Sequence, residues 1–480
     1  MSDRQSLDTA LDAAQARVAA GDGDLDLLAE TAGLLATLGR TDEARQRYLE
    51  VLERDPAHFD TLINFGVLLH ETNYRSAART LFAEAVSRHP NQPLGHVNLA
   101  NLMMYDDEME AARAHYEIAL RLDPGNVHAH QRLSLLMLEL GDREGMRRHR
   151  RLGFAPQPIQ SLPYLGQGKP IRLLVLTSMP AADIAWLKFV DRERFAVTTL
   201  VAEFHDPRAP LPPHDLIFNA IGDADLAADD LVAARALVAR SPAPVINDPA
   251  KVLPTGRAEN AGRLRRVPGV VTPRIVMLPR GAFARLNIAD VLTEAGLAAP
   301  LLIRSPGFHT GRHFVRVDRA EDLAAAAAGL PGEALMAIEY LDARGPDGLA
   351  RKYRVMMIGG ELYPLHLAAS GDWKVHYATG AMDGDAALQA EEAAFLEHMP
   401  AVLGERAMGA LAAIQAALGL DYAGADFALT ADGEVALFEA NAVMNIIPPD
   451  GSPQWDYRRG PVGRAIDAAR EMLAARALSR

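Results

Sequence analysis

Cysteine is absent from this sequence of 480 residues. Disulfide bonds, zinc sites built on thiolates and cysteine nucleophiles are therefore excluded. Lysine is also scarce. Of the 49 lysines and arginines, only five are lysines: Lys169, Lys188, Lys251, Lys352 and Lys374. Since arginine supplies nearly all of the positive charge, a lysine beside a motif is a stronger functional candidate here than in most proteins.

A basic excess and long apolar runs are missing as well. The formal net charge is −13, whereas a nucleic-acid surface needs clustered positive charge. We interpret the one dense basic run, residues 147–151, as the solvated end of a helix. Residues 1–20 carry Asp3, Asp8 and Asp12, and no uninterrupted apolar run has the length of a membrane span. We therefore predict a cytoplasmic protein that binds neither nucleic acid nor a membrane.

The first third of the chain repeats with a period of 34 residues. The recurring positions hold a proline, an alanine, an aromatic residue and a small residue: Pro56, Pro90 and Pro124; Ala44, Ala78 and Ala112; Tyr48, Phe82 and Tyr116; Ala32, Gly66 and Ala100. Paired helices approach closely at the small residue, the aromatic ring fills the next gap, and proline ends the second helix. The pattern resembles the tetratricopeptide repeat, with three units over about residues 25–126 of a domain spanning residues 1–152.

The segment after the third repeat continues the pattern with one change. Residues 127–151 keep Ser134 at the small position but place Arg150 at the aromatic position. We therefore predict a capping helix pair with a polar outer face.

Repeat arrays of this class present a concave groove, which predicts a peptide, a protein partner or a second copy of the chain as occupant. Asn64, Asn98 and Asn101 are candidates for holding a peptide backbone, because an amide side chain both donates and accepts hydrogen bonds. The alternative, that they are ordinary polar residues of exposed helices, carries equal weight. A purely structural role for the array is a further alternative, and a homodimer is compatible with the sequence.

Composition changes after the array. Residues 153–170 mix proline, glutamine and glycine with little periodicity, which is typical of a linker. We then expect strands over residues 171–176, 196–203, 215–221 and 244–247, with helices between them over residues 183–190 and 224–239. This alternation favours a mainly parallel sheet with helices packed on it.

Acidic residues near the C-terminus are spaced as in a hairpin. Asp432-Gly433 is a favoured centre for a two-residue turn, which makes Ala431 and Glu434 the flanking pair and places Asp426 opposite Glu439. Asn441 lies on the same face of its strand, because side chains alternate. Opposed carboxylates repel one another unless a cation lies between them, and oxygen ligands favour Mg²⁺. The alternative is an edge hairpin with solvated acids.

Four segments in the same order resemble the ATP-grasp superfamily, in its RimK and glutathione synthetase branch. These are residues 300–311 (PLLIRSPGFHTG), 337–342 (AIEYLD), 352–360 (KYRVMMIGG) and the hairpin itself. The resemblance covers residues 171–480 and implies a smaller α/β domain over residues 171–265, followed by an ATP-grasp α+β core over residues 266–480. The whole chain is thus expected to combine an α-solenoid with an α/β multidomain body.

The resemblance also implies roles for individual residues. ATP is expected to contact the first phosphate cation, the phosphate loop and the adenine and ribose hinge: Arg257, Arg304, Gly307, His309, Thr310, Gly311, Glu339, Tyr340 and Leu341. Mg²⁺ is expected on Asp426, Glu439 and Asn441. The candidate catalytic residues are Arg354, Lys374 and His376. Arg304 stands where relatives have lysine, so a planar fork replaces a point charge.

Together these observations predict an ATP- and Mg²⁺-dependent ligase that joins a carboxylate to an amine through an acyl phosphate. The substrate is expected to be a peptide, a protein or an amino acid. Two alternatives stay open. The chain could be an adaptor whose core binds nucleotide without ligation, or a phosphotransferase that stops at a phosphorylated product.

Overall fold

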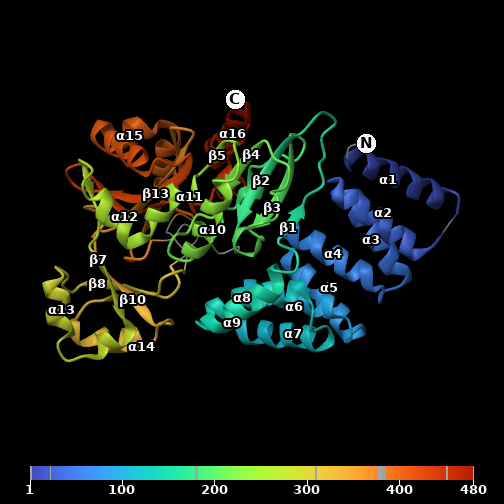
Figure 1. The fold of residues 1–480 in the computed structure, drawn as a ribbon, viewed down its shortest axis with the longest axis horizontal. Coiled ribbons are helices and arrows are strands. Elements are labelled where there is room, and N and C mark those ends of the chain that lie inside the picture. The colour runs from blue at the N-terminus through green and yellow to red at the C-terminus, as the bar shows by residue number, and fades with distance from the viewer. Residues whose placement is uncertain are drawn as a thin grey trace. The chain divides into compact units, whose positions relative to one another are not determined.

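The computed structural model describes residues 3–21, 23–178, 182–308, 311–375, 382, 384–449 and 452–478. The chain folds into two compact units. The first contains residues 1–170 and 192–196, and the second contains residues 171–191 and 197–480. Each unit is described below by itself, with its elements labelled in Figure 1.

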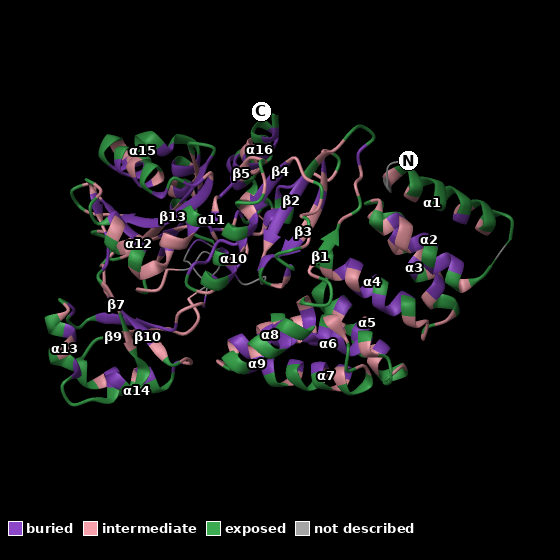
Figure 2. Ribbon diagram, in the orientation of Figure 1, coloured by how far each residue is buried: buried purple, intermediate pink, exposed green. Residues whose placement is uncertain are grey.

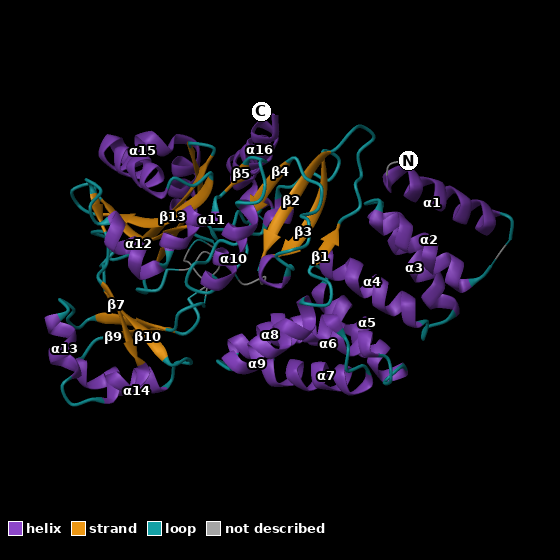
Figure 3. Ribbon diagram, viewed as in Figure 1, coloured by secondary structure: helices purple, strands orange, loops and turns teal. Residues whose placement is uncertain are grey.

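The first unit is helical (Figure 3). A leading helix, α1 (Asp3–Ala19), is followed by four helix pairs: α2 (Leu25–Thr37) with α3 (Thr41–Arg54), α4 (Phe59–Glu71) with α5 (Arg75–Arg88), α6 (Pro93–Tyr105) with α7 (Met109–Leu122), and α8 (Val127–Glu139) with α9 (Arg143–Phe154). A short strand, β1 (Ile159–Ser161), follows them. The predicted repeat architecture is thus confirmed in this unit.

The recurring small residues explain how closely the helices of a pair approach. A Cβ atom added to Gly66 would lie 2.4 Å from the Phe82 ring, so no larger side chain fits there. Ala32, Ala100 and Ser134 are also fully buried. The fourth pair differs from the prediction at one point, because Arg150 occupies the aromatic position and is itself buried. The basic run at residues 147–151 is therefore only partly a solvated helix end.

The second unit begins with a mainly parallel sheet, as predicted. Strands β3, β2, β4 and β5 lie in that order, and β2 pairs parallel with β4, as β4 does with β5. Its elements are β2 (Ile171–Thr177), β3 (Phe195–Val201), β4 (Leu216–Asn219), α10 (Ala228–Val238), β5 (Val245–Ile246), α11 (Pro249–Val252) and α12 (Arg257–Leu264).

The helix predicted over residues 183–190 is wrong. Only one 3₁₀ turn forms there, over Trp186–Lys188. The backbone N–H of Ile184 donates to the Ala220 carbonyl, and Asp183 bridges to Ile221. Asp183 therefore lies in a β-bridge to a neighbouring segment, where the sequence predicts the first residue of a helix.

Two further sheets, antiparallel in all but one of their strand pairings, complete the second unit. The first has the order β7-β10-β8-β9, formed by β7 (Ile275–Pro279), β8 (Leu301–Arg304), β9 (Phe314–Val317) and β10 (Ala334–Glu339). Helices α13 (Ile288–Glu294) and α14 (Leu323–Ala328) cover one face through an apolar cluster that includes Leu292, Ile303 and Leu323. Figure 2 shows exposed residues on the outer surfaces of α13 and α14, whereas β8 and most of β10 are buried.

The second of these sheets has the order β12-β11-β13-β14-β6 and is antiparallel except for the parallel pairing of β14 with β6. Its strands are β6 (Val270–Val271), β11 (Ala350–Ile358), β12 (Glu361–Ser370), β13 (Tyr422–Leu429) and β14 (Val435–Asn441), and its helices are α15 (Ala386–Leu418) and α16 (Asp456–Leu478). Helical array, α/β domain and two-sheet core together confirm the predicted fold class.

Helix α15 is long and apolar enough, by length and composition alone, to cross a membrane. Its backbone leaves helical geometry at His398 and at Gly404, where φ is +77°. It also carries Glu392, which is fully buried in an ion pair with Arg458 of α16 at 2.6 Å. We therefore interpret α15 as a core helix of the second unit.

Asn247 joins the parallel sheet to the C-terminal sheet. Its side chain donates to the Tyr422 carbonyl at 2.8 Å and accepts from the Tyr422 backbone N–H at 2.9 Å. Asn247 has a φ of +54° and is fully buried, and its own backbone N–H donates to Asp421. One amide side chain thus replaces a pair of backbone hydrogen bonds between two strands that come from different sheets.

Candidate nucleotide and metal site

The C-terminal hairpin places Asp426 opposite Glu439, as predicted. The turn itself differs from the prediction, because Thr430 rather than Ala431 pairs with Glu434 and the loop has three residues. That register alone would set Asp426 against Phe438. A β-bulge between Asp426 and Phe427 absorbs Phe438 and restores the pairing with Glu439.

Charged and polar side chains form a row across four strands of this sheet. His366 on β12 pairs with Arg354 on β11, Arg354 with Asp426 on β13, and Asp426 with Glu439 on β14. Paired residues of adjacent strands project from the same face of a sheet. The row therefore places a histidine, an arginine and two carboxylates side by side on one face.

Asp426 is almost completely buried and is held by two cations. Arg354 Nε donates to Oδ1 at 2.6 Å and Arg354 Nη2 to Oδ2 at 2.8 Å, while Lys352 Nζ lies 3.2 Å from Oδ2. Burial by itself would raise the pKa of Asp426, but Arg354 and Lys352 hold that pKa well below its usual range. Asp426 is therefore a carboxylate at neutral pH.

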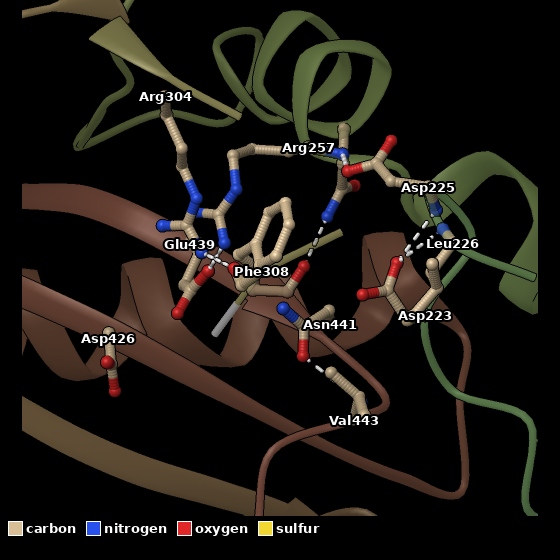
Figure 4. Close-up of polar contacts among 12 residues, drawn as sticks. Asp223, Asp225, Leu226, Arg257, Arg304, Phe308, Asp426, Glu439, Asn441 and Val443 are labelled. Carbon is tan, nitrogen blue, oxygen red and sulfur yellow. Dashed lines mark hydrogen bonds and ion pairs between the residues drawn. The ribbon is translucent and has the colours of Figure 1, made fainter. Parts of the chain in front are cut away.

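Glu439 is held by a third cation, Arg257, the first residue of α12. Burial opposes ionisation of Glu439, yet Arg257 keeps its pKa below the usual range despite the nearby Asp426. Arg304, at the end of β8, lies beside the same pair, and its guanidinium donates to the Phe308 carbonyl. Figure 4 shows the guanidinium groups of Arg257 and Arg304 together beside Glu439.

Positive charge is concentrated at this point of the site. Burial, followed by the charge of Arg257, lowers the pKa of Arg304 to about 10. Two acids at the start of the loop after β4 lie nearby: Asp223 accepts from the backbone N–H groups of Asp225 and Leu226, and Asp225 accepts from that of Arg257. An anionic ligand would relieve the repulsion between Arg257 and Arg304.

Asn441 pairs with Gly424 on the neighbouring strand, and its Oδ1 accepts from the Val443 backbone N–H at 3.1 Å. With Glu439 it lines a pocket bounded on the other side by Asp223, Asp225 and Arg257. Among the residues that the structure describes, no group of three or more histidine, aspartate or glutamate side chains is placed to hold a metal ion.

The predicted metal set draws its third ligand from an amide, and its chemistry fits Mg²⁺. Asp426, Glu439 and Asn441 offer only oxygen donors, which this ion prefers. In the structure both carboxylates are neutralised by arginine and lysine instead. A carboxylate oxygen accepts more than one partner, so a metal ion and these cations can share Asp426 and Glu439.

The predicted phosphate loop lies partly outside the described residues, since it includes His309 and Thr310, and His376 is outside them as well. Both flanking glycines have left-handed backbones, with φ of +81° at Gly307 and +73° at Gly311. A Cβ atom on Gly311 would lie 2.5 Å from Lys374 Cε. Lys374 is therefore packed on the loop, next to the position where the sequence predicts phosphates.

The predicted hinge follows β10. Glu339 accepts from the Arg274 backbone N–H at 2.9 Å through Oε2, so part of its hydrogen-bonding capacity is used within the protein. The Tyr340 ring lies under the guanidinium of Arg316 at 4.5 Å, and Leu341 is half-buried. Tyr340 also joins an apolar cluster on the sheet face opposite α13 and α14, with Met336, Ile338 and Trp373 among its members.

Sequence reasoning missed His366, and the bulges explain why. The Gly359-Gly360 turn sets Ile358 against Glu361, and a regular register from there would place Leu365 opposite Arg354. A bulge beside Pro364 moves His366 into that position. Burial and then Arg354 lower the pKa of His366 well below its usual value, so it is neutral.

Two of the three candidate asparagines of the repeat groove have partners within the array. Asn98 donates to the Leu94 carbonyl of its own helix at 3.1 Å, and Asn101 accepts from the Tyr116 hydroxyl at 2.7 Å. Asn64 is exposed. A role in holding peptide therefore stays a prediction that rests mainly on Asn64.

No protein-family model and no curated protein matches the chain. Among solved structures, the D-Ala:D-Ser ligase VanG from Enterococcus faecalis aligns with 64% of this chain and 100% of its own, at 14% identity and a TM-score of 0.41. MamA from Desulfovibrio magneticus RS-1 aligns with 30% of this chain and 82% of its own, at 23% identity and a TM-score of 0.28. PilF from Pseudomonas aeruginosa aligns with 30% of this chain and 66% of its own, at 20% identity and a TM-score of 0.27. These are likenesses of fold alone.

Proposed function

We propose that the second unit is an ATP- and Mg²⁺-dependent ligase that joins a carboxylate to an amine. The observation that supports this most directly is the convergence of cations on two neighbouring carboxylates, the buried Asp426 and the half-buried Glu439. Arg354 and Lys352 hold Asp426, and Arg257, with Arg304 beside it, holds Glu439. Such an arrangement neutralises a polyphosphate while offering oxygen ligands to its metal ions.

Each residue contributes binding or charge in this proposal. Asp426, Glu439 and Asn441 would hold Mg²⁺, which when bound neutralises phosphate charge and aligns the transferred group. Arg257 and Arg304 would contact the phosphates from one side, and Lys374 from the loop side through Gly311. Glu339 and Tyr340 would meet the ribose and adenine.

The proposed reaction has two steps. A substrate carboxylate oxygen attacks the γ-phosphorus of ATP, the bond to the bridging oxygen breaks, and ADP leaves, giving an acyl phosphate. The amine nitrogen then attacks the carbonyl carbon, the C–O bond to phosphate breaks, and the amine proton leaves with the phosphate. Arg354 stabilises charge on the acyl group, and no side chain acts as a nucleophile.

The repeat array suggests a substrate or partner with a polypeptide chain. Its helix pairs are built as in arrays that bind extended segments or partner subunits. We propose that the first unit binds a peptide or protein, either as the substrate of the ligase or as a partner that brings it. A second copy of the chain is the alternative occupant.

Nucleotide binding and turnover in two variants test this proposal. We expect Mg²⁺ with a non-hydrolysable ATP analogue to bind the intact chain, as measured by calorimetry, and Asp426→Asn and Glu439→Gln each to abolish ADP formation with a panel of peptides and amines. Glu434→Gln is the matched control, because Glu434 lies on the same hairpin but pairs with Arg406 at the surface. Full turnover in both site variants would remove the metal assignment.

An adaptor that binds nucleotide without ligation is the second candidate. The observation that favours it is that both oxygens of Asp426 are engaged by Arg354. Tight Mg²⁺-dependent nucleotide binding with no ADP release, across the same panel, would decide for the adaptor.

A further inference from the structure

Two histidine pairs occupy equivalent positions in the last two helix pairs of the array. His96 and His115 join α6 to α7, and His130 and His149 join α8 to α9, one period of 34 residues later. In each pair the two Nδ1 atoms lie 2.9 Å apart. His96, His130 and His149 are buried, and His115 is half-buried.

The preceding repeat has leucines at the same two positions, Leu62 and Leu81. Leu62 is buried and Leu81 packs against the apolar core of the array. The position therefore belongs to the interface between paired helices in every one of these repeats. The first repeat has Leu28 and Arg47 at these positions, so only the last two repeats place a histidine at both.

Hydrogen bonds fix which nitrogen carries the proton in each ring. His96 Nε2 contacts the Pro90 carbonyl at 3.0 Å, and His130 Nε2 contacts the Pro124 carbonyl at 3.1 Å. A carbonyl only accepts, so these Nε2 atoms are protonated and the Nδ1 atoms of neutral His96 and His130 are acceptors. The donors to them are the Nδ1–H groups of His115 and His149.

His149 shows the consequence of this arrangement most clearly. Its Nε2 carries no proton in the neutral ring and lies 3.2 Å from Arg148 Nη2, which donates to it. A second proton on His149 would sit against that guanidinium. A second proton on His130 would set two N–H groups head to head across 2.9 Å. The packed pair therefore disfavours an added proton on His149.

Charged neighbours act on the pair from several elements. Burial, then His130 and Arg148, lower the pKa of His149 to about 4, against the opposing charges of Asp142 at the start of α9 and Glu117 of α7. Burial and then His96 also lower the pKa of His115.

The sign of the pH effect follows from these shifts. Histidine in the open state titrates near its ordinary pKa of 6.5, so the open state takes up protons that the packed state excludes. Stabilisation by the pair is complete above about pH 6.5 and is lost as the pH falls toward 4.

We propose that the paired histidines make the half of the array formed by α6 to α9 open reversibly on mild acidification, while the half formed by α2 to α5 stays closed. The inference is independent of the ligase proposal, because it concerns only the first unit. For a single histidine shifted as His149 is, the ratio of open to packed forms rises about 10-fold between pH 7.5 and pH 5.5.

Hydrogen exchange of the full chain, read by mass spectrometry at pH 7.5 and pH 5.5, tests the proposal. After correction for the intrinsic effect of pH on exchange, peptides from α6 to α9 should lose about 10-fold more protection than peptides from α2 to α5. An equal change in both halves, or no change in either, would overturn the proposal.

Two variants separate the histidine pairs from other titrating groups. Replacing all four histidines, H96L/H115L/H130L/H149L, installs the leucines of the preceding repeat and should remove the difference between pH values. H115Q/H149Q keeps an uncharged donor toward His96 and His130 and should at least halve that difference without disturbing the fold at pH 7.5. If the difference persists undiminished in H115Q/H149Q, the histidines are not its cause, whether or not the leucine variant folds.

Discussion

At the scale of the residue, the site depends on charges that cannot be buried singly. Asp426 is 2% exposed and both of its oxygens accept from Arg354, with Lys352 as a second cation. A buried carboxylate that loses its partner is strongly destabilised, whereas an exposed pair contributes little. The charges of the row therefore lower the free energy of unfolding unless they stay paired, and the same side chains are the candidates for binding the nucleotide and its metal ion.

Arg354→Met tests how much stability depends on the pairing of Asp426. It should lower the free energy of unfolding by about 3–5 kcal/mol, because Asp426 then keeps only the longer contact with Lys352. Urea unfolding followed by tryptophan fluorescence measures the loss. Arg406→Met is the control, since its pair with Glu434 is solvated and should contribute about 0–1 kcal/mol. Equal losses in the two variants would contradict this account of Asp426.

At the scale of the element, the glycine loop and the link between sheets decide the geometry of the site. Gly311 combines a left-handed backbone with contact to Lys374. Gly348 has a similar φ, +80°, but nothing lies within 4 Å of its would-be Cβ. Alanine substitutions at the two positions therefore distinguish the effect of backbone strain, which both share, from the effect of crowding, which only Gly311 has.

Gly311→Ala should raise the dissociation constant of the magnesium–ATP analogue about 10-fold or more, because the new Cβ displaces Lys374 from the loop. Gly348→Ala should cost about 1 kcal/mol of stability through its backbone and leave nucleotide affinity unchanged. Calorimetric titration of both variants measures the difference. Similar affinities in the two variants would separate Lys374 from nucleotide binding.

Asn247→Ala should lower the free energy of unfolding by about 3 kcal/mol, because it leaves the buried N–H and C=O of Tyr422 without their partners. The exposed Asn287 makes no side-chain cap at the start of α13, so Asn287→Ala should change stability by less than about 0.5 kcal/mol. Urea unfolding measures both changes. A loss below 1 kcal/mol at Asn247 would show that other contacts hold the two sheets together.

At the scale of the whole molecule, both units contain histidines whose pKa values are lowered, His115 and His149 in the first and His366 in the second, and among the described residues only the second adds buried carboxylates to them. The array contains histidines whose pKa values are lowered, so its stability falls between about pH 6.5 and 4. The second unit contains Asp426 and Glu439, whose pKa values are also lowered. For such carboxylates stability is present above the unfolded pKa, about 4, and is lost as the pH falls below it.

The midpoint temperature of thermal unfolding should therefore fall in two separate pH ranges as the solution is acidified. All three tryptophans, Trp186, Trp373 and Trp455, lie in the second unit, so their fluorescence reports on it, whereas far-ultraviolet circular dichroism also reports on the helical array. Both midpoints should fall between pH 6.5 and 4.5, because each unit contains histidines whose pKa values are lowered, and the midpoint by fluorescence should fall more steeply below about pH 4, where Asp426 and Glu439 take up protons. A midpoint by fluorescence that is unchanged from pH 7.5 to pH 3 would contradict this account of the second unit.

The sequence by itself determined the features that depend on local spacing. A period of 34 residues fixed the helix pairs, and alternation placed Glu439 and Asn441 on one face of their strand, because helix and strand geometry are local properties. The tertiary structure decided the rest. Two bulges set the register that brings Glu439 and His366 into the row, and the folding of β8 and α12 onto that sheet brought Arg304 and Arg257 to Glu439. Bulges and long-range contacts depend on how whole sheets pack, so no spacing within a short segment records them.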